Sequence, residues 1–475
     1  MKKILITLFL LMSAAFVMSA QQEFWYEGVH YRAIDYYNAE VISANDSIYS
    51  GRVIIPRYVL CETVDSLGIE HLEGFEVTAI ADSAFFRCTG LTSVALPKSL
   101  LYIGKRAFYY CSGLTSVDIP MSVTNIDDYA FYHCSGLVSV NLSNTVKRLG
   151  HSSFGYCTSL EGINLPNSIT TIEPYAFFSS KLKSIVLPDS LEVIKEAVFA
   201  DTWLTDVTIS NSVKKICGRA FDYCPLTSIE VPNSVEILEG TSFGNCRLLK
   251  DVKLGNSLKR ITGSAFYGCY DLEYVEIPNS VTYMGSMTFW YCRSLKTVKF
   301  GNQVDTIGYG VFYACDSLQS VVFPNSVRYI GSHACYGCGQ LKTVTFGKKL
   351  EWIGNDAFDD AIFESIVSLN RTPPDTYSWT FSRFFETTTL YVPRKAVDAY
   401  RTHEAWSGFL NIVGIDVDPD PGDINDDGTI SIGDVTALID LLLSNGDLPD
   451  YADFDGDGAV DIKDVTALID HLLGN

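Results

Sequence analysis

The chain has 475 residues, of which 47% are hydrophobic, and it carries a formal net charge of −21. This composition allows a large core, and the length indicates either several domains or a repeat array. The charge is concentrated in residues 416–475, where sixteen Asp and one Lys, with no Glu or Arg, give a net of −15. Such a tail predicts disorder or bound cations. Because no basic stripe runs along the chain, a nucleic-acid partner is excluded.

Residues 1–20 have the pattern of a secretory signal peptide. Lys2 and Lys3 precede an apolar run over residues 4–17, and Ser19 and Ala20 form a small-residue cleavage site. The apolar run is too short to span a bilayer, and no later segment is long and apolar enough to do so. We therefore expect a secreted, extracellular protein with no membrane span, either soluble or attached to the cell surface through a partner.

The next segment, residues 21–79, is rich in aromatic and β-branched residues between positions 23 and 59. This composition is typical of β-strands. We interpret the segment as an N-terminal β cap, because the repeat array that follows would otherwise expose strand edges and core at its first unit.

A unit of 22 or 23 residues repeats about thirteen times within residues 80–369. Its most regular position is the Phe of an Ala-Phe pair, and successive units are 23 residues apart except for three consecutive steps of 22. This regularity predicts a repeat solenoid, in which each unit buries its apolar side against its neighbours. The residues at this position are Phe85, Phe108, Phe131, Phe154, Phe177, Phe199, Phe221, Phe243, Phe266, Phe289, Phe312, Cys335 and Phe358.

Each unit also contains an apolar segment of the form L-x-x-V-x-I, such as Leu114, Val117 and Ile119. Its alternation predicts a short strand, which Pro120 would end. Stacked units would place these strands side by side as a parallel β-sheet on one face. A strand spacing of about 4.8 Å then gives a rod or arc about 60 Å long.

The segment "IGKRAFYYCSGLTSVDIP", which begins at Ile103, resembles the unit of the BspA-like leucine-rich repeat family of bacterial surface proteins. The resemblance covers roughly residues 80–369 and recurs with every unit. It implies a leucine-rich repeat solenoid that serves extracellular binding or adhesion without catalysis. The ligand of the repeats, a protein or a glycan, stays open.

Ten of the thirteen Cys occupy one position of the unit, three residues after the Phe. A stack of buried free thiols is expected there, because a small apolar thiol suits an interior corner. The segment "GTSFG" at 240–244 spells a nucleophile motif, but Ser242 stands beside core Phe243 and not at a strand-to-helix elbow. The Cys335-x-x-Cys338 pair has no redox context. We find no catalytic constellation and predict that the protein is not an enzyme.

The outward positions of the predicted strands form a candidate ligand surface. In the later units they carry charges in alternating rows, at Lys250, Lys253, Glu273, Glu276, Lys296 and Lys299. Opposite charges on neighbouring strands also pair with one another, so ligand recognition and cross-strand charge matching are both open. An aromatic stripe after the Phe, with Tyr109 and Trp290 among its members, leaves a similar choice between ligand binding and packing.

Residues 370–415 follow the repeats and predict a C-terminal cap. They contain a strand up to Pro393 and then a short helix with Val397 and Tyr400 on one face. Residues 416–422 form an acidic linker with two Pro.

Two acidic loops of twelve residues come last, "DINDDGTISIGD" at 423–434 and "DFDGDGAVDIKD" at 453–464. Each places oxygen ligands at the spacing of a calcium loop, with Gly428 or Gly458 at the sharp turn. Position 12 is Asp where Glu is usual. We expect two Ca²⁺ ions as cofactors. The expected ligands are Asp423, Asn425, Asp427, the Thr429 carbonyl, Ser431 and Asp434 in the first loop, and Asp453, Asp455, Asp457, the Ala459 carbonyl, Asp461 and Asp464 in the second.

Nearly identical amphipathic segments, "DVTALIDLLL" and "DVTALIDHLL", follow the two loops, and no helix precedes either loop. This duplicated loop and helix resembles a type I dockerin over residues 423–475. The resemblance implies a small all-α calcium-binding module that docks an exported protein onto a cohesin domain. A calcium-stabilised module with no cohesin partner stays open. The resemblance places the partner-binding face at Ile432, Gly433, Ile439, Asp440, Ile462, Lys463, Ile469 and Asp470.

Together these features predict an exported, non-catalytic binding or adhesion protein. Its repeat surface would recognise a protein or glycan, and its calcium-loaded tail would dock onto a cohesin-bearing scaffold or surface protein. The alternative is a component or accessory of an extracellular polysaccharide-degrading complex, with any hydrolase activity residing in the partners.

Overall fold

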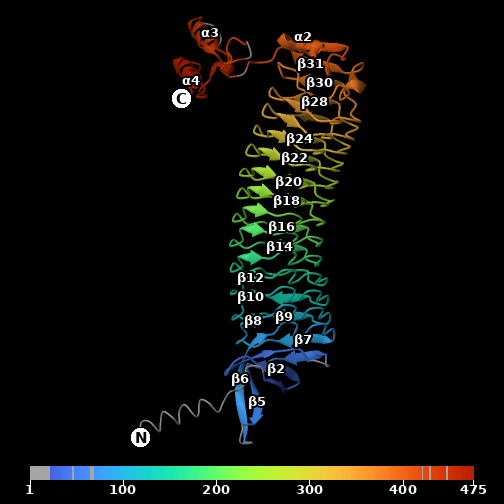
Figure 1. The fold of residues 1–475 in the computed structure, drawn as a ribbon, viewed down its shortest axis with the longest axis vertical. Helices are drawn as coiled ribbons and strands as arrows, with labels where there is room; N and C mark the ends of the chain where they lie inside the picture. The colour runs from blue at the N-terminus through green and yellow to red at the C-terminus, as the bar shows by residue number, and fades with distance from the viewer. Residues whose placement is uncertain are drawn as a thin grey trace.

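The computed structural model describes residues 22–44, 48–64, 69–419, 421–426, 429–444 and 448–474. The predicted signal peptide lies outside these residues. Successive turns of the repeat stack into a long, gently curved rod, with the N-terminal strands at one end and the acidic tail beside the other (Figure 1). Thirteen repeats and one further turn at each end give about fifteen turns, which confirms the repeat solenoid.

One row of strands comes from the L-x-x-V-x-I segments. Neighbouring members pair in parallel and in register, so that Val117 lies opposite Val140 and Ile229 opposite Val252. The row is broken into short sheets of two to five strands. Its members are β7 (Leu91–Ala95), β9 (Ser116–Asp118), β11 (Ser139–Asn141), β14 (Ser184–Val186), β16 (Asp206–Thr208), β18 (Ser228–Glu230), β20 (Asp251–Lys253), β22 (Tyr274–Glu276), β24 (Thr297–Lys299), β26 (Ser320–Val322), β28 (Thr343–Phe346) and β30 (Ser365–Ser368).

A second row of two-residue strands was not expected from the sequence. Each strand ends on a buried aliphatic residue, such as Ile126 or Ile261, and the row forms the longer parallel sheets of the array. Its members are β8 (Tyr102–Ile103), β10 (Asn125–Ile126), β12 (Arg148–Leu149), β13 (Thr171–Ile172), β15 (Val193–Ile194), β17 (Lys215–Ile216), β19 (Ile237–Leu238), β21 (Arg260–Ile261), β23 (Tyr283–Met284), β25 (Thr306–Ile307), β27 (Tyr329–Ile330) and β29 (Trp352–Ile353).

The Ala-Phe segment closes each turn of the array without forming a strand. Residues two before and two after the Phe have positive φ, for example Arg106 at 55° and Tyr110 at 59° around Phe108. This alternation aims every second amide along the rod, so the N–H groups of Arg106, Phe108 and Tyr110 all donate to carbonyls of the next unit. Left-handed backbone is unfavourable for most side chains, and the inter-unit hydrogen bonds offset that cost.

The Phe side chains stack on one another inside the array from Phe85 to Phe312. Adjacent rings lie 4.9 Å apart for Phe85 and Phe108 and 5.3 Å apart for Phe131 and Phe154, nearly parallel in both pairs. Cys335 interrupts the stack. Tyr49 packs on the Phe85 ring at one end and Phe381 packs on the Phe358 ring at the other, so the stack extends one ring beyond the predicted repeats in each direction.

The recurrence of the thiols at one position of the unit has a polar reason as well as a packing one. All thirteen Cys are free, and twelve of them are buried. The Cys134 Sγ donates to the Phe108 carbonyl at 3.1 Å, and the same contact to the preceding unit recurs at other Cys of this position. Thr202 replaces Cys in one short unit and donates instead to the carbonyl of Phe199, in its own unit.

The N-terminal end of the array is covered by strands. Antiparallel β1 and β2 lead into β3, which continues the sheet of the second row through β6. The hairpin of β5 and β6 projects beyond the end of the rod (Figure 1). The bounds are β1 (Glu23–Tyr26), β2 (Val29–Ala33), β3 (Asn38–Val41), β4 (Gly51–Ile54), β5 (Tyr58–Val64) and β6 (Glu70–Ile80).

The C-terminal end is covered by a smaller set of elements. Strands β31 (Thr389–Pro393) and β32 (Asn411–Ile415) extend the first row, and helix α2 (Val397–Thr402) packs beside them. Two short 3₁₀ segments, η1 (Ser382–Phe384) and η2 (Arg394–Ala396), complete the cap. Its aromatic centre is Tyr400 and Trp406, both fully buried.

The tail consists of helices α3 (Ile432–Leu443) and α4 (Ile462–Leu473), with the short η3 (Asp450–Ala452) between them. Val435 and Leu438 of α3 pack with Val465 and Leu468 of α4 in a core separate from that of the array. Over the described ranges, no helix is long and apolar enough to cross a membrane.

Candidate calcium centre and docking face

The second acidic loop gathers its carboxylates at one point. One oxygen each from Asp453, Asp455 and Asp457 lies within 4.8 Å of the others. The turn that brings them together is held by backbone donors: Asp453 accepts from the amides of Gly456 and Gly458, both at 2.9 Å. Both of these glycines have positive φ, a conformation that glycine adopts without cost.

Asp464 closes the second loop from the start of α4. Its side chain is fully buried and accepts from the amides of Phe454 at 2.7 Å, Asp455 at 3.1 Å and Asp461 at 2.7 Å. Asp461 accepts in turn from the Lys463 amide and caps the helix. The sequence places position 12 of the loop at the first turn of α4, and the capping box therefore fixes a predicted ligand and the helix together.

The first loop repeats this arrangement over its described residues. Asp434 is fully buried and accepts from the amides of Asn425 at 3.1 Å and Ser431 at 2.8 Å. The Ser431 hydroxyl caps α3 by accepting from the Gly433 amide. Asp423 is 2% exposed and faces the array, where Arg371 lies 3.1 Å away. The predicted ligand Asp427 lies outside the described residues.

The donor set fits calcium. The converging groups of the second loop are carboxylates, and a hard cation of this size takes six to eight oxygen ligands. The remaining predicted ligands, including the carbonyls of Thr429 and Ala459, come from the same two loops. A bound Ca²⁺ would supply positive charge that offsets the repulsion between these carboxylates, while the chain supplies the geometry through Asp434, Asp464 and the two helix caps.

The predicted partner-binding residues lie on exposed helix faces of the tail. Ile432 and Ile462, at the starts of α3 and α4, are 73% and 67% exposed, which is high for isoleucine. The equivalent residues differ in charge, because Gly433 stands where the second helix has Lys463. The Lys463 ammonium lies 2.7 Å from Asp457. The other predicted positions, Ile439, Asp440, Ile469 and Asp470, are also exposed.

The structure pairs the charges of the predicted solenoid surface with one another. Lys253 lies 2.6 Å from Glu230, Lys296 2.7 Å from Glu273, and Lys299 2.7 Å from Glu276. The hydrogen bond from Lys296 lowers the pKa of Glu273, and Lys250 adds to that effect. These rows therefore show cross-strand charge matching between neighbouring strands.

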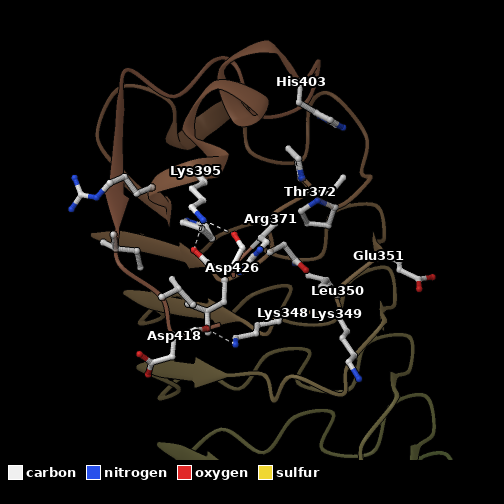
Figure 2. A pocket seen from close by; sticks show the side chains of 18 of the residues that line it. Lys348, Lys349, Leu350, Glu351, Arg371, Thr372, Lys395, His403, Asp418 and Asp426 are labelled. Carbon is white, nitrogen blue, oxygen red and sulfur yellow. Dashed lines mark hydrogen bonds and ion pairs between the residues drawn. The ribbon is translucent and has the colours of Figure 1, made fainter. Parts of the chain in front are cut away.

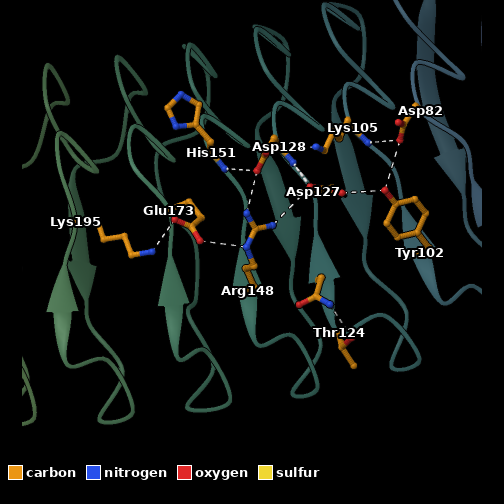
Figure 3. Close-up of polar contacts among 11 residues, drawn as sticks. Asp82, Tyr102, Lys105, Thr124, Asp127, Asp128, Arg148, His151, Glu173 and Lys195 are labelled. Atoms are coloured by element: carbon orange, nitrogen blue, oxygen red, sulfur yellow. Dashed lines mark hydrogen bonds and ion pairs between the residues drawn. The ribbon is translucent and has the colours of Figure 1, made fainter.

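A second set of polar contacts follows the strands of the other row (Figure 3). Arg148 lies 3.0 Å from Asp128 and 3.2 Å from Glu173, and Lys195 lies 2.6 Å from Glu173. Burial alone would raise the pKa of Asp128, but hydrogen bonds from the His151 amide and from Arg148 outweigh it and lower that pKa. These contacts join four successive units and serve the array itself.

Members of the aromatic stripe stack on one another. Phe86, Tyr109 and Tyr132 stack at 5.1 Å, and Trp290, Tyr313 and Tyr336 stack at 3.9 and 4.9 Å. Each ring in these two groups stacks on the face of the next. The packing interpretation of the stripe is therefore favoured over a flat platform for sugars.

The two motifs set aside in the sequence are buried. Ser242 is fully buried, and its hydroxyl has no hydrogen-bond partner among the described residues. Cys335 and Cys338 are both fully buried free thiols. Burial raises the pKa of Cys335 well above its usual value, which opposes formation of a reactive thiolate.

Sequence reasoning missed a basic patch at the C-terminal end of the array, made of Lys348, Arg371, Arg394 and Lys395. These four side chains contact residues of the linker and of the first acidic loop. They come from three separate turns of the chain, so no local motif marks them. The one local signal was Asp426, an extra carboxylate at position 4 of the first loop where the second loop has Gly456.

The family model of the BspA type leucine rich repeat region matches at residues 75–181, 124–250, 193–319, 241–365 and 305–399. The family model of the dockerin type I domain matches at residues 421–473. Dockerin type I domains bind calcium and cohesin domains, and both kinds of domain are non-catalytic. No curated protein sequence matches the chain.

Among solved structures, a leucine-rich repeat protein from Bacteroides ovatus is 23% identical, with a TM-score of 0.49, and the match covers 79% of this chain and 99% of that one. A leucine rich cell surface protein from Faecalibacterium prausnitzii is 22% identical, with a TM-score of 0.43 and coverage of 72% and 94%. The pneumococcal vaccine antigen PcpA is 18% identical, with a TM-score of 0.41 and coverage of 84% and 100%.

The repeat matches span most of the chain, and they coincide with the stacked turns seen in the structure. The chain belongs to the BspA type leucine-rich repeat family, and it carries a dockerin type I domain at its C-terminus.

Proposed function

We propose that this protein is an exported, non-catalytic binding protein that is anchored by its dockerin. In this proposal the solenoid presents a protein- or glycan-binding surface, and the calcium-loaded tail docks onto a cohesin domain of a scaffold or surface protein. The observation that carries the proposal is the paired loop and helix of the tail, with its converging carboxylates and its exposed isoleucines, at the end of a rigid array.

Two calcium ions are part of the proposal, one in each loop. The described carboxylates of the second loop converge, and the first loop repeats the buried Asp at position 12 and the capped helix. In this arrangement calcium organises the loops and thereby sets the spacing of the exposed faces of α3 and α4. Cohesin binding is consequently expected to require calcium.

Membership of a polysaccharide-degrading complex is a second version of the same proposal. It shares the cohesin partner and differs in what the solenoid recognises. A glycan array and a panel of extracellular matrix proteins, probed with the full chain, separate the two versions, and hydrolysis of any polysaccharide would contradict the non-catalytic proposal.

The docking proposal is tested by calorimetry of the full chain with purified cohesin domains encoded in the same genome, in calcium and in chelator. We expect binding by at least one cohesin in calcium only. The variant Ile432→Ala/Ile462→Ala should bind more weakly, and Ile54→Ala, an exposed isoleucine of the N-terminal cap, should bind as the parent does. No binding by any cohesin in calcium would contradict the docking proposal.

A further inference from the structure

The acidic tail contacts the C-terminal end of the array. A groove of about 980 Å³ lies between the C-terminal end of the solenoid and the linker, and Figure 2 shows its side chains. The solenoid and its cap line this groove with six basic residues, Arg328, Lys348, Lys349, Arg371, Arg394 and Lys395, and with the acidic Glu351 and Asp375, of which Glu351 pairs with Arg328. The tail contributes Asp416, Asp418 and Asp426 from the other side. In a chain of net charge −21, this local excess of cations is unusual and matches the acidic segment that faces it.

Each member of the basic patch contacts the tail at a different point. Lys348 donates to the Asp418 carbonyl at 2.7 Å, and Arg394 lies 2.8 Å from the Asp416 carboxylate. Lys395 lies 2.6 Å from the Asp426 carboxylate and also donates to the Asp426 carbonyl. Arg371 contacts both Asp426 and Asp423. The contacts continue from the start of the linker into the first loop.

Asp426 is the residue that makes the first loop fit this patch. It is position 4 of the loop, outside the set of predicted ligands, and it has a φ of 56°. The equivalent residue of the second loop is Gly456, with a φ of 73°. Left-handed backbone favours glycine, so a carboxylate at this position carries a conformational cost that its ion pairs with Arg371 and Lys395 offset.

Asp423 is both a predicted calcium ligand and a contact of the basic patch. It is position 1 of the first loop, it is 2% exposed, and its carboxylate lies 3.1 Å from the Arg371 guanidinium. A divalent cation at the same carboxylate would lie close to that fixed positive charge. Two cations that share one buried carboxylate repel each other, and the repulsion is strong where water is largely excluded.

We propose that the basic patch is a docking surface for the first calcium loop, and that docking on the patch and calcium binding at that loop oppose each other. This inference rests on the calcium binding proposed above. At low calcium the start of the first loop is held against the array, and calcium at that loop loosens the contact. By linkage, the patch weakens calcium binding at the first loop by the same factor by which calcium weakens docking. The second loop lacks the carboxylate at position 4, so its calcium binding is unaffected.

The test uses the full chain in a calcium titration followed by hydrogen–deuterium exchange, with peptides that cover residues 423–434 and 453–464 separately. The double variant Arg371→Gln/Lys395→Gln removes the patch contacts, and Asp426→Asn removes their partner without altering a predicted ligand. Arg383→Gln is the matched control, because Arg383 pairs with Asp359 of the array and not with the tail.

We expect the calcium midpoint of the first loop to fall on the order of fivefold or more in the double variant and in Asp426→Asn, at the low end of typical couplings between sites. The second loop and the Arg383→Gln control should keep the parent midpoints. Small-angle X-ray scattering should show the tail of the parent extending on addition of calcium, and the tail of the double variant extended at both calcium levels.

An unchanged or higher midpoint at the first loop of the double variant would overturn the antagonism. If neither loop responds to calcium in any of these proteins, the calcium proposal itself fails, and the two failures are thereby distinguished.

Discussion

At the scale of the residue, each position of the repeat carries a physical role that its neighbours copy. Phe131 is fully buried between the rings of Phe108 and Phe154, 5.0 and 5.3 Å away. Thr115 is exposed next to β9, and its hydroxyl donates to the Thr92 carbonyl at 3.2 Å. In this stack each buried ring contacts two others, so the loss of one ring removes packing contacts from both neighbouring units.

Replacement of Phe131 by Ala should destabilise the array by about 3–5 kcal/mol, through loss of apolar burial and the cavity left between two rings. Thr115→Ala should cost less than about 1 kcal/mol, since it removes one exposed hydrogen bond. The measurement is the urea midpoint of the array transition. Equal shifts for the two variants would contradict the assignment of inside and outside positions.

The thiols offer a second test at this scale. Because all thirteen Cys are free, denatured and unreduced protein should take up thirteen equivalents of an alkylating reagent, counted by mass spectrometry. In the native state only Cys217, which is half-buried, should react within the first labelling time, and slowly, since burial raises its pKa to about 11. Uptake of only a few equivalents by the denatured chain would show disulfides instead.

The charged rows predict a dependence of stability on pH. Hydrogen bonds from Lys181 and Lys183 lower the pKa of Glu161 from 4.5 to about 2 in the folded state. A lowered pKa contributes stability above the unfolded value, and that contribution is lost as the pH falls through the folded value.

We therefore expect the urea midpoint to fall between about pH 4.5 and pH 2, and Glu161→Gln to lose less over that interval. The effect should shrink in 1 M salt, because these side chains are exposed. A midpoint of Glu161→Gln that falls as steeply as that of the parent would contradict the ion-pair assignment.

At the scale of the element, the tail joins each predicted ligand set to a helix cap. Asp464, in the first turn of α4, accepts hydrogen bonds from three amides of the second loop, so one predicted ligand also takes part in the helix cap. The tail has only a small apolar core, and Leu472 of α4, 38% exposed, lies outside its described part. Calcium binding should therefore supply much of the folding free energy of the tail.

Calorimetry of the full chain should accordingly show two calcium ions bound, and Asp464→Ala should bind one at most. The substitution removes a predicted ligand and leaves three backbone amides without their charged acceptor, and a hydrogen bond to a charged group contributes about 1.5–3 kcal/mol. Asp470→Ala, on the exposed face of α4, is the control and should keep both sites. Two ions retained by Asp464→Ala would remove this residue from the ligand set.

At the scale of the whole molecule, the features predicted from the sequence are those that the chain repeats. The Phe and Cys positions recur every 22 or 23 residues, and the two acidic loops share one spacing, so each instance supports the others. The second strand row was missed because each member is only two residues long, too short for alternation to be recognised.

The residues that cover the two ends of the array could not be predicted from the repeat period. Phe381 follows Phe358 by the regular 23 residues, but its surrounding segment lacks the unit's other positions. Tyr49 precedes Phe85 by 36 residues and keeps no period at all. Contacts such as Arg371 with Asp426 join residues 55 apart in different domains, and they depend on how the tail folds back. Nothing local in the sequence encodes that geometry.

The division of the chain into a calcium-independent array and a calcium-dependent docking module is tested most directly by hydrogen–deuterium exchange of the intact protein in calcium and in chelator. Amides of α3 and α4 should be protected in calcium and exchange rapidly in chelator, while amides of the strand rows stay protected in both. Equal protection of α3 and α4 in chelator, or loss of protection throughout the array, would contradict this division.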